Sequence, residues 1–164
     1  MSSVQGIAHV YGDHIDTDRI IPGKYTKTLD RRVLAAHVLE DLDPDFASKV
    51  RPGDIMVAGK NFGSGSSREQ APIALQAAGV AAVVALSFAR IFYRNAVNIG
   101  LPVVEIRTHT IRSGDEIRVD LQKGEVFNLN QNNHHTATQM PPQMIAILNE
   151  GGLVAYLRKH GDYV

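Results

Sequence analysis

Residues 59–70 have the sequence Gly-Lys-Asn-Phe-Gly-Ser-Gly-Ser-Ser-Arg-Glu-Gln, and the elements on either side of them decide the fold. The apolar run 54–58 before this loop predicts a buried strand, and the periodic apolar residues of 72–78 after it predict a helix. Glycines let the backbone approach a ligand closely, and the N-terminus of a helix carries about half a unit of positive charge. The stretch therefore predicts an anion-binding site between a strand and a helix.

Pro72 limits where this helix begins, because a proline is tolerated only in the first helical turn. We therefore expect the helix to start near Glu69 or Gln70. Ser66 and Ser67 each have the Ser-x-x-Glu/Gln spacing of a capping box, so one of them could simply cap the helix. Capping accounts for one serine, but not for three serines, three glycines and an arginine in one loop.

Other glycine-rich and serine motifs do not fit this loop. A P-loop needs Gly-Lys-Ser/Thr after four spacer residues, and a dinucleotide-binding loop needs a third glycine where Arg68 stands. A nucleophile elbow needs Gly-x-Ser-x-Gly, and that register fails. A hydrolase triad has little support, because the chain has no cysteine and no histidine near the loop.

Recognition of a polycarboxylate fits the loop better. Arg68 can hold a carboxylate with two parallel hydrogen bonds, and Ser67 with the free amides can take the remaining lone pairs. A guanidinium and a helix N-terminus both stabilise a nearby alkoxide, so Ser66 could act as a general base on an acidic C–H group. A positioned base contributes ~10²–10⁴-fold, so an elimination also needs an electrophile, and this chain supplies none.

The rest of the chain predicts an α/β fold. The expected elements are a strand over 4–11, a helix over 30–42 capped by Asp30, strands over 80–86 and 101–106, and helices over 88–99 and 143–149. Residues 153–158 are expected to form a short apolar closing element. Two strand–helix units in succession imply a parallel, buried central sheet with flanking helices.

The pattern changes in the last third of the chain. Alternating apolar residues over 111–121 and 125–129, bounded by turn signals, predict short antiparallel strands. We expect a solvated loop over 128–138. The pair His134 and His135 lies in that loop without a metal-ligand spacing, so we expect no metal site there.

Composition excludes several classes of function. The chain of 164 residues predicts one domain over 1–164, and its 17 basic residues balance 17 acidic ones, so no global field favours nucleic acid or a membrane. It has no cysteine, which excludes disulfides, a thiolate nucleophile and a cluster ligated by its own thiolates. No apolar run reaches the ~20 residues of a membrane span and no secretory signal is visible, so we expect a cytoplasmic protein.

Residues 24–29, Lys-Tyr-Thr-Lys-Thr-Leu, are polar and without helical period, which predicts an exposed loop. Two interpretations are open: a surface connector, which the composition favours, or a flap that contacts the substrate.

Three blocks of the sequence resemble the aconitase superfamily. Residues 61–71, Asn-Phe-Gly-Ser-Gly-Ser-Ser-Arg-Glu-Gln-Ala, resemble the signature of its swivel domain, and residues 87–96 resemble its second block. Residues 16–23, which include Asp-Thr-Asp and Ile-Ile-Pro-Gly, resemble its first block. Over residues 6–157, length and motif order are similar to the free-standing small subunits of 3-isopropylmalate dehydratase and homoaconitase.

The resemblance implies a swivelling β/β/α fold and a hydro-lyase that reversibly dehydrates a hydroxy polycarboxylate, in leucine biosynthesis where the substrate is an isopropylmalate. It implies that a separate large subunit carries a 4Fe-4S cluster, whose open iron acts as a Lewis acid on the departing hydroxyl, so that this chain binds no cofactor. The expected partners are that large subunit and the small-molecule substrate, without nucleic acid or membrane. A homo-oligomer of the isolated chain stays open.

The resemblance also assigns roles to single residues. Ser66 corresponds to the serine alkoxide base and Arg68 to the arginine that binds the substrate carboxylate. Ser67 corresponds to the hydroxyl and amide beside it, and Asp18 to an aspartate at the edge of the active site. The family often has cysteine where Ser64 stands, a nearly isosteric change that should not disturb the base.

Thr26, Lys27 and Thr28 correspond to a loop that touches the variable group of the substrate, so the resemblance favours the second interpretation of this segment. The family often has an apolar residue or arginine at the position of Lys27. An arginine there would favour a distal carboxylate, as in homoaconitate, and an apolar residue an isopropyl group. A lysine at position 27 does not decide between these two substrates.

Two other classes of function compete with this interpretation. A non-catalytic anion-binding or regulatory module would keep the loop without a cluster-bearing partner. A nucleotide- or phosphate-binding domain is disfavoured because the loop lacks the P-loop lysine. The intact Ser66-Ser67-Arg68 set favours the hydro-lyase, because a binding module has no need of Ser66.

Overall fold

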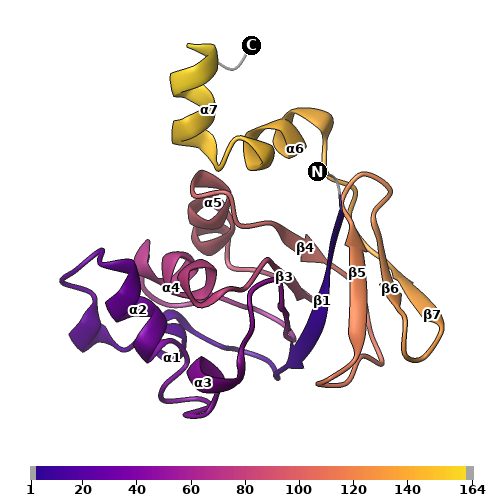
Figure 1. Cartoon of the computed structure of the whole chain (residues 1–164), viewed down its shortest axis with the longest axis horizontal. Helices are drawn as coiled ribbons and strands as arrows, with labels where there is room; N and C mark the ends of the chain where they lie inside the picture. The colour runs from indigo at the N-terminus through magenta and orange to yellow at the C-terminus, as the bar shows by residue number, and fades with distance from the viewer. Residues whose placement is uncertain (1–2, 162–164) are drawn as a thin grey trace.

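The computed structural model describes residues 3–161 as one continuous sheet with helices packed around it (Figure 1). The strands are β1 (Ser3–Val10), β2 (Ile55–Val57), β3 (Ala82–Ala85), β4 (Val103–Glu105), β5 (Glu116–Asp120), β6 (Glu125–Asn128) and β7 (Asn133–Thr136). The helices are α1 (Thr17–Ile20), the 3₁₀ turn η1 (Gly23–Tyr25), α2 (Arg31–His37), α3 (Phe46–Lys49), α4 (Gln70–Ala78), α5 (Arg90–Asn98), α6 (Pro142–Asn149) and α7 (Leu153–His160).

The sheet has the strand order β4-β3-β2-β1-β5-β6-β7. The strands β1 to β4 pair in parallel, whereas β5, β6 and β7 continue the sheet antiparallel from β1. Each parallel neighbour after β2 is reached through a helix, since parallel strands need a crossover connection. The predicted α/β fold, with a partly parallel central sheet, flanking helices and short antiparallel strands, is confirmed.

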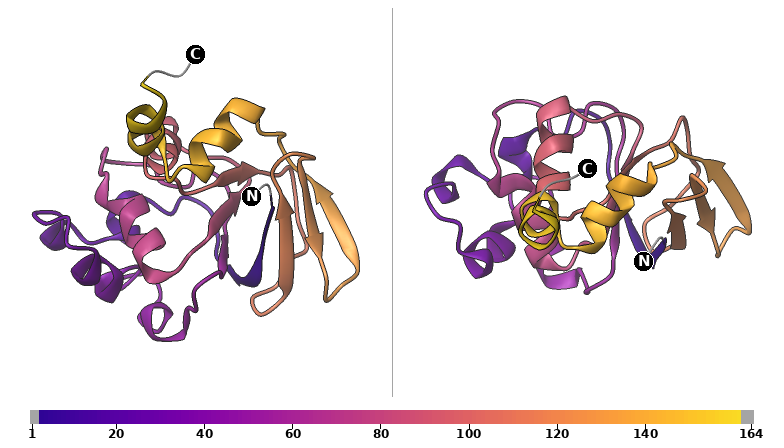
Figure 2. Two further views of the ribbon diagram at one scale, coloured as in Figure 1. Left: turned by 45° about the horizontal axis from the view of Figure 1, so that its top comes forward. Right: turned by 90° about the horizontal axis from the view of Figure 1, so that it is seen from above.

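The parallel strands are buried on both faces because the sheet curls. Met56 and Val83 face the helices in one hydrophobic cluster. Val57 and Val84 point to the opposite face, into a second cluster with residues of the antiparallel strands. This alternation follows from the two-residue period of a strand. Figures 1 and 2 show helices α1 to α5 on one side, β5 to β7 on the other, and α6 crossing the end of the sheet.

The curl brings the two edges of the sheet together. Ile106, after β4, forms an isolated antiparallel bridge with Ala137, after β7. The backbone N–H of Thr138 donates to the carbonyl oxygen of Glu105 at 2.9 Å. These two contacts join the ends of β4 and β7, so part of each edge is paired within the chain.

The predicted helix over 30–42 is wrong in its second half. The Asp30 side chain does cap α2, accepting from the backbone N–H of Arg32 at 3.0 Å, but α2 ends at His37. Val38 is extended and Leu39 has φ 55°. Both side chains are buried, and the N–H of Leu39 donates to the carbonyl oxygen of Ile20 at 2.8 Å. Burial against α1 therefore outweighs helical propensity here.

The predicted solvated loop over 128–138 is also wrong. Residues of β7 pair with β6, with His134 opposite Phe127 and His135 opposite Val126. The sequence of β7, Asn-His-His-Thr, has no apolar alternation because this strand lies at the edge of the sheet and has no buried side chain. The closing element over 153–158 is the helix α7.

None of the helices described between residues 3 and 161 has the length and apolar composition needed to cross a lipid bilayer.

Asp115, in the turn before β5, is a buried carboxylate that organises the antiparallel strands. Its Oδ2 accepts from the side-chain amides of Asn128 and Gln131, each at 2.8 Å, and from the backbone N–H of Arg112 at 2.9 Å. The Asn128 amide, the Arg112 N–H and the Gln131 amide hold the pKa of Asp115 below its ordinary value of 3.8. The ionised carboxylate thus stabilises the fold above about pH 4 and stops doing so as the pH falls through the lowered pKa.

We expect Asp115→Asn to lower the melting temperature at pH 7 by roughly 5 °C, because a neutral amide oxygen accepts these three hydrogen bonds more weakly than an ionised carboxylate does. The difference from wild type should shrink as the pH falls from about 4 toward 3, where the wild-type carboxyl also becomes protonated. Circular dichroism melts at each pH measure this. The exposed Asp41→Asn is the control, and an equal pH dependence in both variants would contradict the assignment.

Candidate active site

The glycine-rich loop 59–70 leaves the carboxyl end of β2 and enters α4, as the sequence predicts. The helix α4 begins at Gln70, which confirms the limit set by Pro72, and it ends at Gly79 in the left-handed conformation. Its N-cap residue is Glu69, and no side chain caps it. The capping interpretation of Ser66 and Ser67 is therefore wrong.

The mouth of α4 keeps several donors free. Within residues 3–161, the hydroxyl groups of Ser66 and Ser67 form no hydrogen bond, and neither do the backbone N–H groups of Ser66, Ser67, Glu69 and Gln70. Ser66 and Ser67 are exposed. Free helix-terminal amides and hydroxyls at an open surface make a favourable site for an anion.

Two glycines allow the shape of this loop. Gly63 and Gly65 have φ 81° and 93°, which favour glycine. A Cβ atom on Gly63 would lie 2.3 Å from Cγ of Phe92, so a larger residue cannot take this position without displacing the aromatic core. The loop is thus held close to α5.

The first sequence block anchors the loop from one side. The N–H of Gly63 donates to the carbonyl oxygen of Ile15 at 2.8 Å, and the N–H of Thr17 donates to that of Ser64 at 2.8 Å. Asp16 caps α1 by accepting from the N–H of Arg19 at 2.9 Å. These bonds fix α1, and with it Asp18, beside the loop.

The second sequence block anchors the loop from the other side. Phe62 forms a parallel bridge with Phe88, and its ring packs edge-on against Phe92 with ring centroids 5.0 Å apart. The N–H of Asn61 donates to Oγ of Ser87 at 2.8 Å. The predicted helix over 88–99 starts only at Arg90, because residues 87–89 extend along the loop.

Arg68 is the central charged group of the site. Its side chain is 21% exposed, and Nη1 forms an ion pair with Asp18 and a longer contact, 3.4 Å, with the carbonyl oxygen of Ile21. Among the described residues, Nε and Nη2 of Arg68 have no hydrogen-bond partner. Gly23 lies beside Nη2, where a methyl group on the glycine would stand 3.4 Å from that nitrogen. Asp18 orients Arg68, while a second edge stays free to hold a carboxylate with two bonds.

A polar cavity of about 340 Å³ opens next to Arg68. All six residues that line it are polar, and they come from the segment 24–29, the loop, α4 and α5: Thr26, Ser67, Arg68, Glu69, Gln70 and Asn95. The Nε2 of Gln70 donates to the carbonyl oxygen of Thr26 at 2.9 Å, which holds the segment 24–29 over the helix start. A volume of this size suits a small, highly polar ligand.

The segment 24–29 is held by specific contacts with α2 and the residues around it. Tyr25 stacks on His37 with ring centroids 3.9 Å apart, and Nδ1 of His37 bonds Oε1 of Glu40 at 2.8 Å. Thr26 lines the cavity, whereas Lys27 is exposed and does not. Oγ1 of Thr28 accepts from the N–H of Asp30 at 3.0 Å, just before the start of α2.

The structure thus brings Ser66, Ser67, Arg68, Asp18 and Thr26 together, with Lys27 at the outer edge. Sequence reasoning did not identify Asn95, which reaches the cavity from α5 and has no side-chain hydrogen bond within residues 3–161. The only feature of the sequence that could have indicated a role for Asn95 was its position in the second block, residues 87–96.

The described part of the chain holds no group of three His, Asp or Glu side chains that could bind a metal ion. The site can therefore bind and orient an anion and hold a hydroxyl near it, but its ligand set does not suit a metal of its own.

Comparison with known proteins gives a consistent set of relatives. Residues 42–109 match the family model described as the aconitase C-terminal domain. The chain is 57% identical over 158 residues to 3-isopropylmalate dehydratase small subunit 2 of Archaeoglobus fulgidus, covering 96% of both proteins. It is 52% identical over 158 residues to the 3-isopropylmalate dehydratase small subunit of Moorella thermoacetica, covering 95% of both. The crystal structure of 3-isopropylmalate dehydratase from Methanocaldococcus jannaschii matches with a TM-score of 0.92 at 47% identity, over 97% of this chain and 95% of that one.

Proposed function

Because the chain belongs to the family of 3-isopropylmalate dehydratase small subunits, within the aconitase superfamily, we propose that its loop 59–70 forms one half of a hydro-lyase active site. The other half belongs to a large subunit. Together they would remove water from an isopropyl-substituted malate and add it back, a reaction of leucine biosynthesis. One observation carries this proposal: two free hydroxyls, free amides and the free edge of Arg68 meet at one open surface, and the fold itself uses none of them.

In this proposal Arg68 binds and orients the substrate. Its Nε and Nη2 hold one carboxylate in a two-bond geometry, while the ion pair with Asp18 keeps the guanidinium plane fixed. The hydroxyl and N–H of Ser67 take further lone pairs of the same carboxylate. Asp18 therefore acts through Arg68, as a positioning residue at the edge of the site.

Ser66 is the proposed general base. During dehydration its alkoxide takes the proton from the carbon next to the carboxylate, as the hydroxyl leaves the neighbouring carbon. During hydration the Ser66 hydroxyl returns this proton. The positive charge of Arg68 and the N-terminus of α4 both favour the alkoxide, and the exposure of Ser66 lets a substrate bound against another protein reach it.

The chain offers no place of its own for an iron–sulfur cluster. It has no cysteine, and iron–sulfur clusters are held chiefly by cysteine thiolates. We therefore place the 4Fe-4S cluster on the large subunit, where it would supply the electrophile that a serine base alone lacks.

The proposal is tested by reconstitution. The chain is copurified with the cluster-bearing large subunit of the same source, and hydration and dehydration of several 2-substituted malates are assayed. Turnover that requires both subunits supports the proposal. A stable complex without turnover of any malate would instead favour a non-catalytic, anion-binding regulatory role.

Substitution of Lys27 tests which malate derivative is the substrate. Homoaconitate is the alternative to the isopropyl-substituted malate. Because Lys27 stands exposed beside the cavity-lining Thr26, we propose that it contacts the variable group of the substrate. Lys27→Leu should lower kcat/KM about tenfold for a malate with a distal carboxylate and leave an isopropyl substrate unaffected or improved.

Lys24→Leu is the matched control, since Lys24 is an exposed lysine of the same segment that lies over the Tyr25 ring instead of the cavity. The ratio of kcat/KM for the two substrates is compared between wild type and Lys27→Leu. An unchanged ratio would show that Lys27 does not contribute to substrate specificity.

A further inference from the structure

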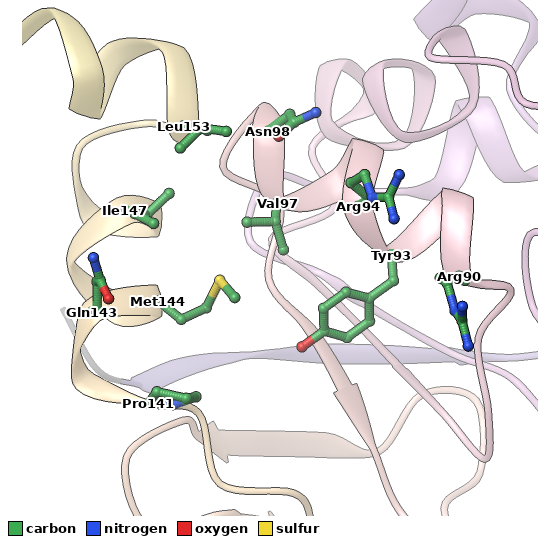
Figure 3. A pocket seen from close by; sticks show the side chains of 10 residues that line it. All are labelled: Arg90, Tyr93, Arg94, Val97, Asn98, Pro141, Gln143, Met144, Ile147 and Leu153. Carbon is green, nitrogen blue, oxygen red and sulfur yellow. The ribbon is translucent and has the colours of Figure 1, made fainter. Parts of the chain in front are cut away.

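A second cavity of about 700 Å³ lies along α5 (Figure 3). It is a groove between α5 and the pair α6 and α7. Its floor is apolar, formed by Val97, Met144, Ile147 and Leu153. Figure 3 shows these side chains facing one another across the gap without closing it. The groove is therefore large enough for an apolar side chain from outside.

The rim of the groove carries positive charge. Arg90 and Arg94 are one turn apart on α5 and both line the groove. Both are exposed, and neither forms an ion pair with another residue between 3 and 161. A partner with carboxylates around an apolar residue would match this rim and floor.

The surface next to the groove is unusually apolar for exposed helices. Ile91 on α5 is 48% exposed and Val154 on α7 is 56% exposed. The helix α7, which stands at the edge of the molecule in Figure 1, has no buried residue although five of its eight residues, 153–157, are apolar or aromatic. Exposed apolar side chains on two of the helices that border the groove favour an interaction site there.

The groove and the substrate cavity are both lined by residues of α5, on neighbouring parts of its surface. Ile91 precedes Arg94 by three residues and Asn95 by four, so it touches both positions on the helix surface. Arg94 lines the groove, whereas Asn95 lines the substrate cavity. A protein that covers the cavity therefore also covers Ile91 and meets the groove.

We propose that the groove between α5, α6 and α7 is a docking site for the large subunit, which inserts an apolar side chain flanked by carboxylates. This inference rests on the proposed function, because that function requires the large subunit to cover the Ser66 and Arg68 surface. A second copy of this chain on the same surface would instead block Asn95 and the substrate cavity.

Ile91→Asp tests the proposal, because an exposed residue in the first turn of α5 tolerates an acidic side chain without loss of folding. The dissociation constant for the purified large subunit, measured by isothermal titration calorimetry, should rise by at least about tenfold. Leu129→Asp is the matched control, since Leu129 is 44% exposed and directly follows β6 instead of lying on α5, α6 or α7, and its dissociation constant should stay at the wild-type value.

Charge reversal tests the rim in the same way. Arg90→Glu should weaken association by about tenfold and reduce its salt dependence, whereas Lys123→Glu, in the turn between β5 and β6, should not. Wild-type affinity in both Ile91→Asp and Arg90→Glu would overturn the proposal. So would a change in the self-association of the isolated chain without a change in affinity for the large subunit.

The proposed docking site and the proposed catalytic roles of Ser66 and Arg68 can be disproved by different measurements. Loss of the docking site weakens the complex, but a saturating concentration of large subunit restores turnover. An incorrect assignment of Ser66 or Arg68 leaves the dissociation constant unchanged and appears only in kinetics.

Discussion

In the enzyme reconstituted with its large subunit, Ser66→Ala is expected to lower kcat by about 10²–10⁴-fold, the range that a positioned general base contributes. Folding and association should stay near wild type, because Ser66 is exposed and its hydroxyl bonds nothing within residues 3–161. KM should change little, since the carboxylate is held by Arg68. The measurement is steady-state turnover at saturating large subunit, with the complex verified by size-exclusion chromatography.

Ser64→Ala is the matched control in the same loop. Only the carbonyl oxygen of Ser64 is used, as the acceptor for the N–H of Thr17, so loss of the hydroxyl should leave kcat unchanged. A second readout separates base catalysis from structure: exchange of the substrate C–H proton with solvent should be lost in Ser66→Ala and kept in Ser64→Ala. Near-normal turnover in Ser66→Ala would refute the base assignment.

The sequence predicted the loop and its neighbours well because their constraints are local. Pro72 cannot lie deep inside a helix, so the start of α4 was fixed to within a residue or two. The buried parallel strands are continuous apolar runs, and Gly79 ends α4 as expected. Such features depend on a few adjacent residues.

The errors come from contacts between distant parts of the chain. The helix over 30–42 stops early because Leu39 is buried and bonds Ile20, and no local pattern shows this. The edge strand β7 has a polar sequence with no strand pattern of its own. It is a strand because it pairs with β6. Asn95 was missed for the same reason: its role depends on α5 lying against the loop.

The ion pair between Arg68 and Asp18 joins residues fifty positions apart, and it gives Arg68 one occupied and one free edge. The resemblance placed both residues at the site. Only the structure shows that Asp18 pairs with one edge of the Arg68 guanidinium and leaves the other edge free. Arg68 therefore has a fixed orientation before any substrate binds, which lowers the cost of binding.

Arg68→Lys is expected to raise KM by about 10²-fold with a smaller fall in kcat, because lysine keeps the charge but not the planar two-bond geometry. Arg19→Lys is the matched control, an exposed arginine of α1 beside Asp18. Steady-state kinetics on the reconstituted enzyme give KM and kcat for both.

The pattern of KM and kcat decides what Arg68 does. If Arg68 only stabilised the charge of the Ser66 alkoxide, Arg68→Lys would leave KM unchanged and lower kcat. The lysine ammonium would still stabilise the alkoxide, but less effectively because it is less well placed. If it orients the carboxylate through its free edge, Asp18→Asn should also raise KM, by a smaller factor of about 3–10, since the guanidinium loses its fixed plane. The double variant should then cost less than the sum of the two single changes in free energy, because both act on one interaction. Additive effects would show that Asp18 and Arg68 act separately, and the positioning role of Asp18 would have to be abandoned.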